Sequence, residues 1–231
     1  MGQAGHILKK FDEELSTLRD LVLRMGGLAE EQLRRALAAL DAQTDSEGVR
    51  AIVAGDREID RIELRADEEV AHLLALRSPL GIDLRTVLTF AKTVTDLERI
   101  GDEAKKIAKT ARAMGEAGAD TAQPFLAPLR GVGTAAQESL RGALDALVRL
   151  DLARAEAVKQ GDATVDAAFK AAITHITATM QAEPTRVAAG VQAIFAAKAM
   201  ERIGDHAKNI AQYVFYLVQG RDVRHPRARQ P

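Results

Sequence analysis

The two halves of this chain repeat one another, and this internal repeat restricts the possible fold more than any other feature of the sequence. The pentapeptide Glu-Arg-Ile-Gly-Asp occurs at 98–102 and again at 201–205. The offset between matching positions drifts slowly and in one direction, which indicates an ancient duplication of a unit of roughly 105 residues. The matches that define the alignment are 33–37 with 140–144, 45–60 with 151–166, Pro79 with Pro184, and 98–102 with 201–205.

Each repeated unit has the hydrophobic pattern of three long helices. Hydrophobic residues make up 47% of the chain, but aromatic residues only 3%, and tryptophan is absent. Alanine and leucine dominate and runs of β-branched residues are scarce, which is typical of helical proteins. Between 8 and 40 the apolar residues recur every three or four positions, as in a coiled-coil stripe. The sequence therefore predicts an all-α protein of six helices, arranged as two pseudo-symmetric three-helix bundles.

Capping and helix-breaking residues predict where these helices begin and end. Asp45 and its counterpart Asp151 are the expected N-caps of the second helix of each unit. Ser78-Pro79 is expected to end the second helix, and Gly220 the last one. The glycines and prolines of 115–133 predict the connection between the units, although the next helix can begin inside this segment. The predicted organisation is a first unit at 1–114, a linker at 115–123, a second unit at 124–220 and a basic, flexible tail at 221–231.

The charge balance and the composition exclude several classes of protein. With 32 basic and 33 acidic residues, the chain lacks the basic excess that is typical of nucleic-acid-binding proteins. It has no cysteine, which excludes disulfides and thiolate metal sites and fits a reducing compartment. Neither a secretory signal pattern nor an uninterrupted apolar run of about 18 residues is visible. We therefore expect a cytoplasmic protein that binds no nucleic acid and does not insert into a membrane.

Carboxylates spaced four residues apart mark the second and third helices of each unit. In each copy of Glu-Arg-Ile-Gly-Asp, the glutamate and the aspartate lie one helical turn apart, beside the apolar stripe rather than in it. The second helix of each unit carries two aspartates with the same spacing. Counted from the turns near Pro79 and Pro184, the pairs on the two helices should lie level in an antiparallel hairpin. The sequence thus predicts two clusters: Asp56, Asp60, Glu98 and Asp102 in the first unit, and Asp162, Asp166, Glu201 and Asp205 in the second.

Such a cluster is unfavourable unless a cation compensates it. Like charges at this spacing cost about 0.2–0.5 kcal/mol per pair, and Gly101 and Gly204 each cost about 1 kcal/mol relative to alanine in a helix interior. Hard divalent or trivalent cations bind clustered carboxylate oxygens, so we predict metal ions here: iron, zinc, manganese or magnesium. The glycines would leave room for an ion or for close helix approach. The alternative is a solvated flank whose carboxylates are neutralised by nearby basic residues: Arg99, Lys105, Arg202 and Lys208.

Other candidate chemistry has less support in the sequence. Residues 69–72 match one Glu-x-x-His motif, but a di-iron bundle needs two, and His72 lies roughly 18 Å along its helix from Asp60. His206 adjoins Asp205, yet its counterpart in the first unit is Glu103, which argues against a shared role as a ligand. A carboxylate-bridged metalloenzyme, an oxidase or a hydrolase, is the rival functional class at this point.

Taken together, these motifs resemble those of the PhoU family of phosphate-uptake regulators. The resemblance covers essentially the whole chain, from Phe11-Asp-Glu-Glu-Leu through Met25-Gly-Gly-Leu to 213–220. It is specific because Glu-Arg-Ile-Gly-Asp occurs twice and a Gly-Asp-x-x-x-Asp segment lies on each second helix. Membership implies two pseudo-symmetric three-helix bundles. It also implies multinuclear metal clusters bound through (Glu/Asp)-x-x-x-Asp motifs, which here are the eight carboxylates named above.

The resemblance also implies a function. It implies a cytoplasmic adaptor that is not an enzyme. Such proteins are thought to couple the phosphate-specific ABC transporter, through its ATPase subunit, to a membrane sensor histidine kinase. They restrain phosphate uptake and phosphate-regulon signalling. A homodimer is the expected assembly, and no role is implied for the C-terminal tail.

Overall fold

The computed structural model describes residues 2–42 and 46–224, with side chains for 9–40 and 47–224. Within these ranges the chain forms six α-helices and one short 3₁₀ turn, η1, and no strand. The predicted all-α class with six helices is therefore confirmed. The elements are α1 Gly2–Ala42, α2 Ser46–Arg77, α3 Gly81–Glu116, α4 Ala119–Arg149, α5 Leu152–Ala182, η1 Pro184–Arg186 and α6 Val187–Gln219.

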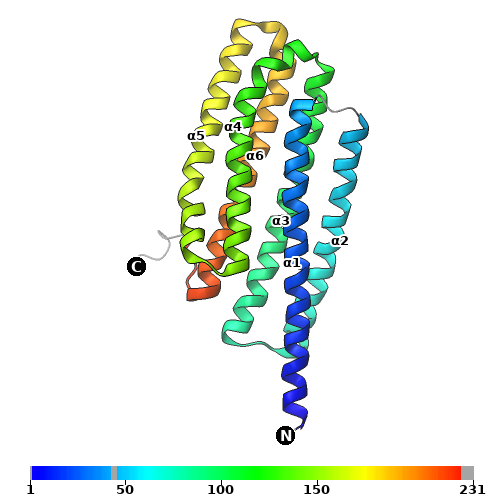
Figure 1. Cartoon of the computed structure of the whole chain (residues 1–231), viewed down its shortest axis with the longest axis vertical. Coiled ribbons are helices and arrows are strands. Elements are labelled where there is room, and N and C mark those ends of the chain that lie inside the picture. Colours follow the sequence, from blue (N-terminus) through cyan, green and yellow to red (C-terminus); the bar gives the residue numbers. More distant parts are fainter. Residues whose placement is uncertain (1, 43–45, 225–231) are drawn as a thin grey trace.

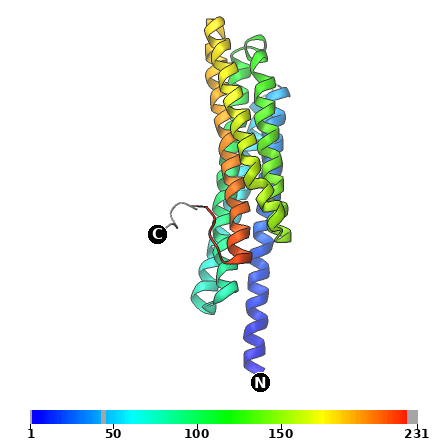
Figure 2. The same ribbon diagram turned by 90° about the vertical axis from the view of Figure 1, so that its left-hand side faces the viewer.

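The helices run side by side along one long axis, so the molecule is a narrow bundle (Figures 1 and 2). Helices α1, α2 and α3 form one three-helix bundle, and α4, α5 and α6 form the other. The two bundles join along two helix pairs, α1 with α4 and α3 with α6. In both views the N-terminal part of α1 extends beyond the end of the bundle. The predicted duplication is thus visible as two like units packed against each other.

Glycines allow α1 and α4 to approach closely, and they do so symmetrically. A Cβ atom added to Gly26 would lie 2.9 Å from Cδ2 of Leu144, and one added to Gly133 would lie 2.6 Å from Cδ2 of Leu37. Gly26 aligns with Gly133, and Leu37 with Leu144, at the same offset of 107 residues. Each helix therefore places a leucine on the glycine of the other helix. This reciprocal contact is the one expected of two copies related by a pseudo-two-fold axis.

The core is built from the apolar stripes that the sequence shows. Burial of one such aliphatic side chain contributes roughly 1.5–3 kcal/mol, so the inward faces of the helices supply most of the stabilisation. Although the described helices are long, none carries an apolar stretch suited to crossing a membrane. Side chains with no exposed surface include Leu18, Met25, Leu33, Ile59, Leu97, Ile100, Leu129, Ile203 and Ile210.

Most of the predicted helix ends are confirmed. Asp151 is the N-cap of α5, and its Oδ1 accepts hydrogen bonds from the two backbone N–H groups at 153 and 154, at 2.9 and 3.0 Å. Helix α2 ends directly before Ser78-Pro79, and α3 begins at Gly81, whose φ is +59°. Gly220, with φ +70°, ends α6 in the left-handed conformation that favours glycine. The predicted N-cap Asp45 lies outside the described residues.

The connection between the two units is shorter than the predicted linker at 115–123. Helix α3 continues to Glu116 and α4 begins at Ala119, so only residues 117 and 118 lie between them. Gly118 makes this sharp reversal possible, because its φ of +107° is accessible to glycine but strained for other residues. The prolines that suggested a loop lie inside α4 instead.

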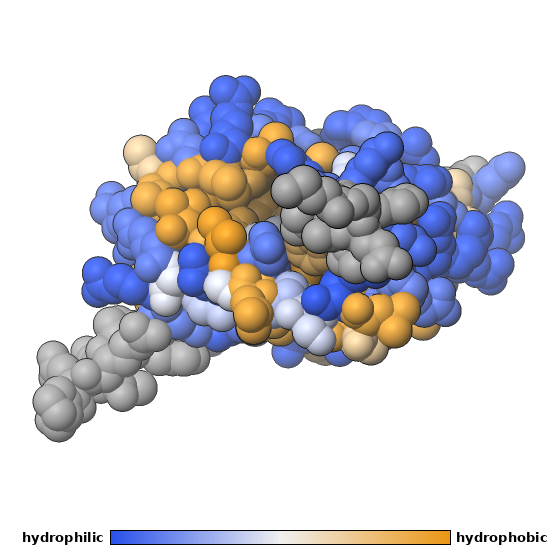
Figure 3. Space-filling view, turned by 90° about the horizontal axis from the view of Figure 1, so that it is seen from below, coloured by the Kyte–Doolittle hydropathy of each residue, from blue (hydrophilic) through white to orange (hydrophobic). Residues whose placement is uncertain are grey.

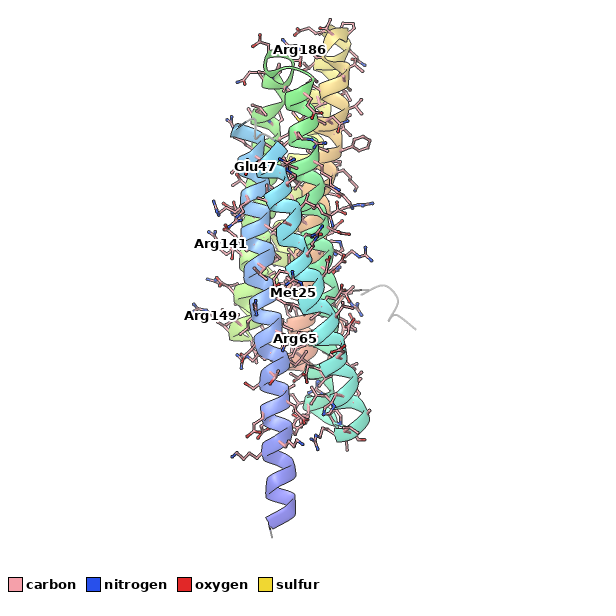
Figure 4. All side chains as sticks on the ribbon, turned by 90° about the vertical axis from the view of Figure 1, so that its right-hand side faces the viewer. Met25, Glu47, Arg65, Arg141, Arg149 and Arg186 are labelled. Atoms are coloured by element: carbon pink, nitrogen blue, oxygen red, sulfur yellow. The ribbon has the colours of Figure 1, made fainter. Side chains whose placement is uncertain are left out.

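Helix α4 passes through two prolines because neighbouring side chains replace the hydrogen bonds that they remove. A proline has no N–H, so the carbonyl four residues before it loses its helical partner. For Pro124 this carbonyl belongs to Asp120, and Nη1 of Arg186 donates to it. For Pro128 it is the carbonyl of Pro124, to which Nε2 of His175 donates at 3.1 Å. Figure 4 labels Arg186 at the upper end of the molecule.

The first residues of the predicted tail lie against the bundle. The guanidinium of Arg224 forms an ion pair with Asp222 and lies 5.4 Å from the centre of the Tyr213 ring. On α3, Lys92 lies over the same ring at 5.8 Å. Arg224 therefore contacts α6 beside Lys92 of α3, and the remainder of the tail, 225–231, lies outside the described residues.

Candidate functional site

The first predicted carboxylate cluster lies between α2 and α3, where the antiparallel helices place their acidic pairs level. Lys105 of α3 joins the two helices, because its Nζ contacts Oδ2 of Asp56 and lies 2.7 Å from Oδ1 of Asp102. Asp60 lies within electrostatic range of Asp56, and Glu98 within range of Asp102. The structure thus gathers all four predicted residues in one region and places a lysine ammonium between two of them.

Asp56 is buried, whereas the sequence placed it beside the core. It is only 4% exposed. Gln32 of α1 donates through Nε2 to Oδ1 of Asp56 at 3.2 Å and to the backbone carbonyl of Gly101 at 3.1 Å. A Cβ atom added to Gly101 would lie 3.2 Å from Oδ1 of Asp56 and 3.0 Å from Ile59. Of the two roles considered for this glycine, the structure therefore supports close helix approach.

The second cluster lies between α5 and α6 and follows the same plan. Lys208, the counterpart of Lys105, contacts Oδ2 of Asp162 across the two helices. Lys198 lies 2.6 Å from Oε2 of Glu201. Asp205 interacts electrostatically with Glu201 and with Asp162. The four predicted residues of this cluster, Asp162, Asp166, Glu201 and Asp205, thus belong to facing helices of one hairpin.

The pKa values show that nearby cations only partly compensate the negative charge. Burial raises the pKa of Asp60, Glu98 and Asp205, and repulsion from the neighbouring carboxylates of the same cluster raises it further. Asp102 behaves differently. Burial acts to raise its pKa, but the hydrogen bond and charge of Lys105, together with the charges of Lys106 and Arg99, outweigh burial, so its pKa lies below the ordinary value. Three of the predicted ligands therefore carry a charge that their surroundings disfavour.

Basic residues neutralise part of the clusters, as the solvated-flank interpretation expects. Arg99 lies 3.4 Å from Glu98 and 4.0 Å from Asp102. Its counterpart Arg202 instead lies 3.1 Å from Glu103, across the interface between the two units. The arginine of the same pentapeptide thus contributes to the cluster in the first unit and to the interface in the second.

The donor set fits a hard metal ion, but an ion requires a rearrangement in order to bind. Carboxylate oxygens are the ligands that such ions prefer. In the structure, lysine ammonium groups, those of Lys105 and Lys208, already take the place of a cation against these carboxylates. As the described side chains stand, no three aspartate, glutamate or histidine residues lie close enough together to hold one ion. Binding therefore requires the lysines to move aside, and the metal sites stay a prediction.

The two histidines considered as metal ligands from the sequence contact residues outside the predicted clusters. His206 places Nδ1 at 2.7 Å from Oδ1 of Asp96, across the interface between α6 and α3. His72 places Nε2 at 3.4 Å from Glu14 of α1. Neither contact involves the predicted clusters, which agrees with the low weight that the sequence gave these histidines.

Two further residues belong to the first cluster, although the sequence did not indicate them. Glu63 of α2 is partly buried, and its pKa is raised by burial, then by repulsion from Asp67 and from Asp60. Its position three residues after Asp60 on the same helix could have revealed it. Gln32 gave no such signal, because it lies on another helix and its counterpart in the second unit is Ser139.

An apolar cavity of about 420 Å³ lies at the end of the molecule where α1 extends. Figure 3 views this end and shows a patch of hydrophobic surface there. Leu15, Phe90, Leu147 and Leu217 line the cavity, together with other residues of α1, α3, α4 and α6. None of the eight predicted carboxylates lines it, so the cavity and the carboxylate clusters are separate features.

Comparison with known families identifies the repeated unit. A family model described as the PhoU domain matches the chain twice, at 22–111 and at 129–214. The chain belongs to the PhoU family. Each PhoU match falls on one three-helix bundle and contains one of the two carboxylate clusters. The resemblance drawn from the sequence is therefore confirmed.

Relatives named as PhoU are similar along nearly the whole chain. The phosphate-specific transport system accessory protein PhoU homolog of Pseudomonas aeruginosa is 40% identical over 95% of this chain and 90% of its own length. The accessory protein PhoU of Escherichia coli (strain K12) is 35% identical over the same shares. The crystal structure of PhoU from Pseudomonas aeruginosa matches with a TM-score of 0.87 at 39% identity, covering 91% of this chain and all of the other.

A more distant solved structure shows the same fold. The phosphate transport system regulatory protein PhoU from Streptococcus pneumoniae matches with a TM-score of 0.81 at 28% identity. It covers 92% of this chain and 99% of the other. The PhoU fold is thus retained where fewer than a third of the residues are identical.

Proposed function

We propose that this PhoU-family chain regulates phosphate uptake as an accessory protein of a phosphate-specific transport system. The observation that carries the proposal is the double PhoU match, one on each three-helix bundle. It is supported by relatives that carry the name of phosphate-specific transport accessory proteins and that align over 95% of this chain.

A test in cells addresses this role directly. Expression of the chain in Escherichia coli that lacks its own PhoU should restore low expression of a phosphate-starvation reporter in phosphate-rich medium. Leu33→Asp is the negative control, because an unpaired charge at this fully buried position should prevent folding. Reporter expression that stays high while the chain is soluble and abundant would contradict the proposal.

More specifically, we propose that the chain is a negative adaptor in the cytoplasm. In this form the chain binds the ATPase subunit of the phosphate-specific ABC transporter and a sensor histidine kinase, and it restrains both uptake and phosphate-regulon signalling. The narrow bundle exposes long helix faces on more than one side, which supports contact with two partners (Figure 2). A homodimer is part of the same proposal.

Purified components test the adaptor and the dimer. The chain should retain the transporter ATPase subunit, or the cytoplasmic part of the sensor kinase, in a pull-down with and without phosphate and metal. Light scattering of the chain alone should give twice the mass of 24.9 kDa. If neither partner is retained under any of these conditions, the adaptor proposal fails. A monomeric mass would overturn only the dimer.

We also propose that the two carboxylate clusters bind iron, zinc, manganese or magnesium ions. The support is chemical, because carboxylates with raised pKa values gather in each unit and lysine ammonium groups occupy the place of a cation. A bound ion would supply positive charge that relieves this repulsion. Asp102 and Asp205 are the residues whose removal should report on the two sites separately.

Elemental analysis of protein purified without chelator tests the metal sites. Asp102→Ala and Asp205→Ala should each lower the metal content, and the double variant should nearly abolish it. Asp20→Ala, an exposed position on α1, is the matched control and should leave the content unchanged. Without metal, Asp205→Ala should raise the melting temperature, because it relieves repulsion between carboxylates. With metal it should lower the melting temperature, because an ion that binds only the folded state stabilises it and the variant has lost a ligand. Equal melting shifts with chelator and with metal would refute the sites.

The relatives are named as accessory or regulatory proteins, which supports a role without catalysis. The rival metalloenzyme makes a distinct prediction. The metal-loaded chain would then consume oxygen or hydrolyse a phosphoester, and the double variant Asp102→Ala/Asp205→Ala would lose this turnover. We expect no turnover above that of the free metal ion.

A further inference from the structure

The apolar cavity where α1 extends collects much of the exposed hydrophobic surface of the molecule. It has a volume of about 420 Å³ and lies between α1, α3, α4 and α6. Of the eleven large hydrophobic residues that are exposed in the described part of the chain, five line this cavity (Figure 3). They are Leu23, Ile82, Val148, Leu150 and Val218. Exposed apolar surface that gathers in one hollow is typical of an interaction site.

Leu150 contributes to this cavity at a cost to its own backbone. It ends α4, and its φ of +52° lies in the left-handed region that favours glycine or asparagine over leucine. Its exposed fraction is 48%, so burial within the chain compensates little of this strain. A leucine that is both strained and exposed indicates that another molecule covers it.

Helix α1 forms one wall of the cavity and continues past it. Its lining residues recur every three or four positions, so they form one face of the helix. They are Asp12, Leu15, Ser16, Arg19, Val22 and Leu23. The helix begins at Gly2, about 15 Å before Asp12, and this segment extends beyond the bundle (Figures 1 and 2). In the sequence the same stripe continues through Leu8, four residues before Asp12. The extension therefore has the apolar spacing of a helix that packs against another helix.

The charges beside this stripe are complementary in an antiparallel pair. If two copies of α1 lie antiparallel with residues 10 and 11 nearest the two-fold axis, Lys9 of each copy is level with Asp12 of the other, because both helices rise equally per residue. A parallel pair would place Lys9 beside Lys9. In its own chain the Lys9 ammonium lies 3.8 Å from Glu13, whereas Asp12 forms no ion pair with any described residue. Asp12 therefore offers a carboxylate to a cation from outside the chain.

We infer that the cavity receives the N-terminal segment of α1 from a second copy of this chain, and that the exchange is reciprocal. The register that pairs Lys9 with Asp12 also places residues 2–6 of one copy level with residues 15–19 of the other, along the wall of the cavity. Only a second copy can supply this segment, because it is continuous with α1 and leads away from the cavity of its own chain. The inference rests on the proposed homodimer and names the surface that forms it.

An exchange of charges tests the antiparallel register. Sedimentation equilibrium gives the dissociation constant of the dimer for each variant. Lys9→Glu and Asp12→Lys should each weaken the dimer by about tenfold, because the two-fold axis repeats each new repulsion. The double variant Lys9→Glu/Asp12→Lys restores opposite charges at both places, so its dissociation constant should return to within about threefold of the parent. The two losses should shrink in about 1 M salt.

Lys10→Glu is the matched control for this exchange. It makes the same change of charge and weakens the helix in the same way, because residue 10 lies three and four positions before Glu13 and Glu14. Residue 10 is rotated by about 100° from residue 9, away from the flank that Lys9 shares with Asp12. The dissociation constant of this variant should therefore stay within about threefold of the parent.

Leu150→Asn tests the cavity side of the contact. Asparagine tolerates the left-handed conformation, so the melting temperature, measured below the dissociation constant, should rise by about 2–4 °C. The dimer should nevertheless weaken by about tenfold, because the cavity loses an apolar side chain that the second copy covers. Leu64→Asn removes a leucine that is 65% exposed on α2, outside the cavity, and should leave the affinity within about threefold. A merely structural role of Leu150 predicts the change in melting temperature without the change in affinity.

The outcomes separate this inference from the proposed homodimer beneath it. A dimer whose affinity is unchanged by Lys9→Glu and by Leu150→Asn would overturn the inference and leave the homodimer standing. Equal weakening by Lys10→Glu and Lys9→Glu, or a double variant that does not recover, would overturn it as well. A parent chain that is monomeric at every concentration would overturn the homodimer and the inference together, and the role in phosphate transport would stand.

Discussion

At the scale of the residue, the aspartates of the two Glu-Arg-Ile-Gly-Asp copies have pKa values that are shifted in opposite directions. Burial acts to raise the pKa of Asp102, but Lys105 at 2.7 Å and the charges of Lys106 and Arg99 together outweigh burial, so the pKa lies below the ordinary value. Burial also raises the pKa of Asp205, and there Glu201 and Asp162 raise it further. The neighbours of each aspartate, and not the motif, decide the sign of the shift.

We expect Asp205→Asn to stabilise the metal-free protein near neutral pH. A folded pKa above the ordinary 3.8 means that the native state holds the proton more tightly. The protonated carboxyl of Asp205 therefore contributes stability below pH 3.8, and this contribution is lost as the pH rises through the folded pKa. The variant should therefore gain about 0.3–0.5 kcal/mol in the free energy of unfolding near pH 7. The gain should vanish towards pH 4, as urea unfolding with chelator would record.

Asp102→Asn is the matched comparison and should act in the opposite direction. Because the pKa of Asp102 is lowered, its stabilisation is present above 3.8 and is lost as the pH falls through the folded pKa. Its replacement should cost stability near pH 7 and have little effect in acid. A gain in stability for Asp102→Asn at neutral pH would contradict the assigned role of Lys105.

At the scale of the element, the helices depend on contacts that compensate local defects. Two prolines interrupt the hydrogen bonding of α4, and donors from η1 and α5 restore it. Glycines in α1 and α4 lower helix propensity, but each one accepts a leucine of the facing helix. In both cases a residue that weakens its own helix is retained because a neighbouring element uses the space or the carbonyl that it leaves.

A double-mutant cycle tests the proline compensation. His175→Ala should destabilise the protein by about 1 kcal/mol, because the carbonyl of Pro124 loses its donor. Pro128→Ala restores a backbone N–H to the same carbonyl, so His175→Ala should cost much less in that background. Pro124→Ala instead restores a backbone donor to the carbonyl of Asp120, which then no longer needs Arg186. It should leave the cost of His175→Ala unchanged. Chemical denaturation of the parent, the three single variants and the two double variants gives the coupling energies. An equal cost of His175→Ala in every background would refute the compensation.

The glycine contact predicts opposite effects for two neighbouring substitutions on α4. Gly133→Ala should destabilise by about 1–2 kcal/mol, because its Cβ would lie 2.6 Å from Leu37. Gly131→Ala should stabilise by up to about 1 kcal/mol, because nothing lies within 4 Å of its added Cβ and alanine favours the helix. Melting curves of both variants would decide this, and stabilisation by Gly133→Ala would show that the helices can adjust.

At the scale of the whole molecule, a polar network in the α3–α6 interface breaks the symmetry of the duplication. Asp96 is 6% exposed, and its Oδ1 lies 2.7 Å from Nδ1 of His206 and accepts a hydrogen bond from Asn209 at 3.2 Å. The counterpart of Asp96 in the second unit is Ala199. The two units are therefore joined by contacts that neither unit could make with a second copy of itself.

Asp96→Ala should weaken this interface by about 2–3 kcal/mol, because His206 and Asn209 would remain partly buried without their acceptor. Glu103→Ala is the matched control on the same helix and is similarly buried. Its partners Arg202 and Lys106 are half exposed and can turn to water, so the loss should be at most half as large. Calorimetry of both variants measures the difference. Equal losses would show that the network is not specific to Asp96.

Much of the architecture follows from local sequence signals. The apolar stripe between 8 and 40, which includes Leu33, predicted a buried face, because a helix of 3.6 residues per turn presents such positions on one side. The alignment of Pro79 with Pro184, together with the other repeated matches, predicted that the chain folds as two like units. The level placement of Asp56 and Asp102 followed from counting residues back and forward from one turn, since both helices rise equally per residue.

The sequence by itself determined the six helices, the duplication, the family and the meeting of the acidic pairs, because periodicity and residue counting are properties of one helix or one hairpin. Only the tertiary structure decided what surrounds those pairs. It buried Asp56 against Gln32 of a third helix, left Ser139 with no partner among the described residues, and carried α4 through its prolines. These outcomes depend on side chains from elements far apart in the chain. Such contacts form only when the helices pack, so a local sequence pattern does not predict them.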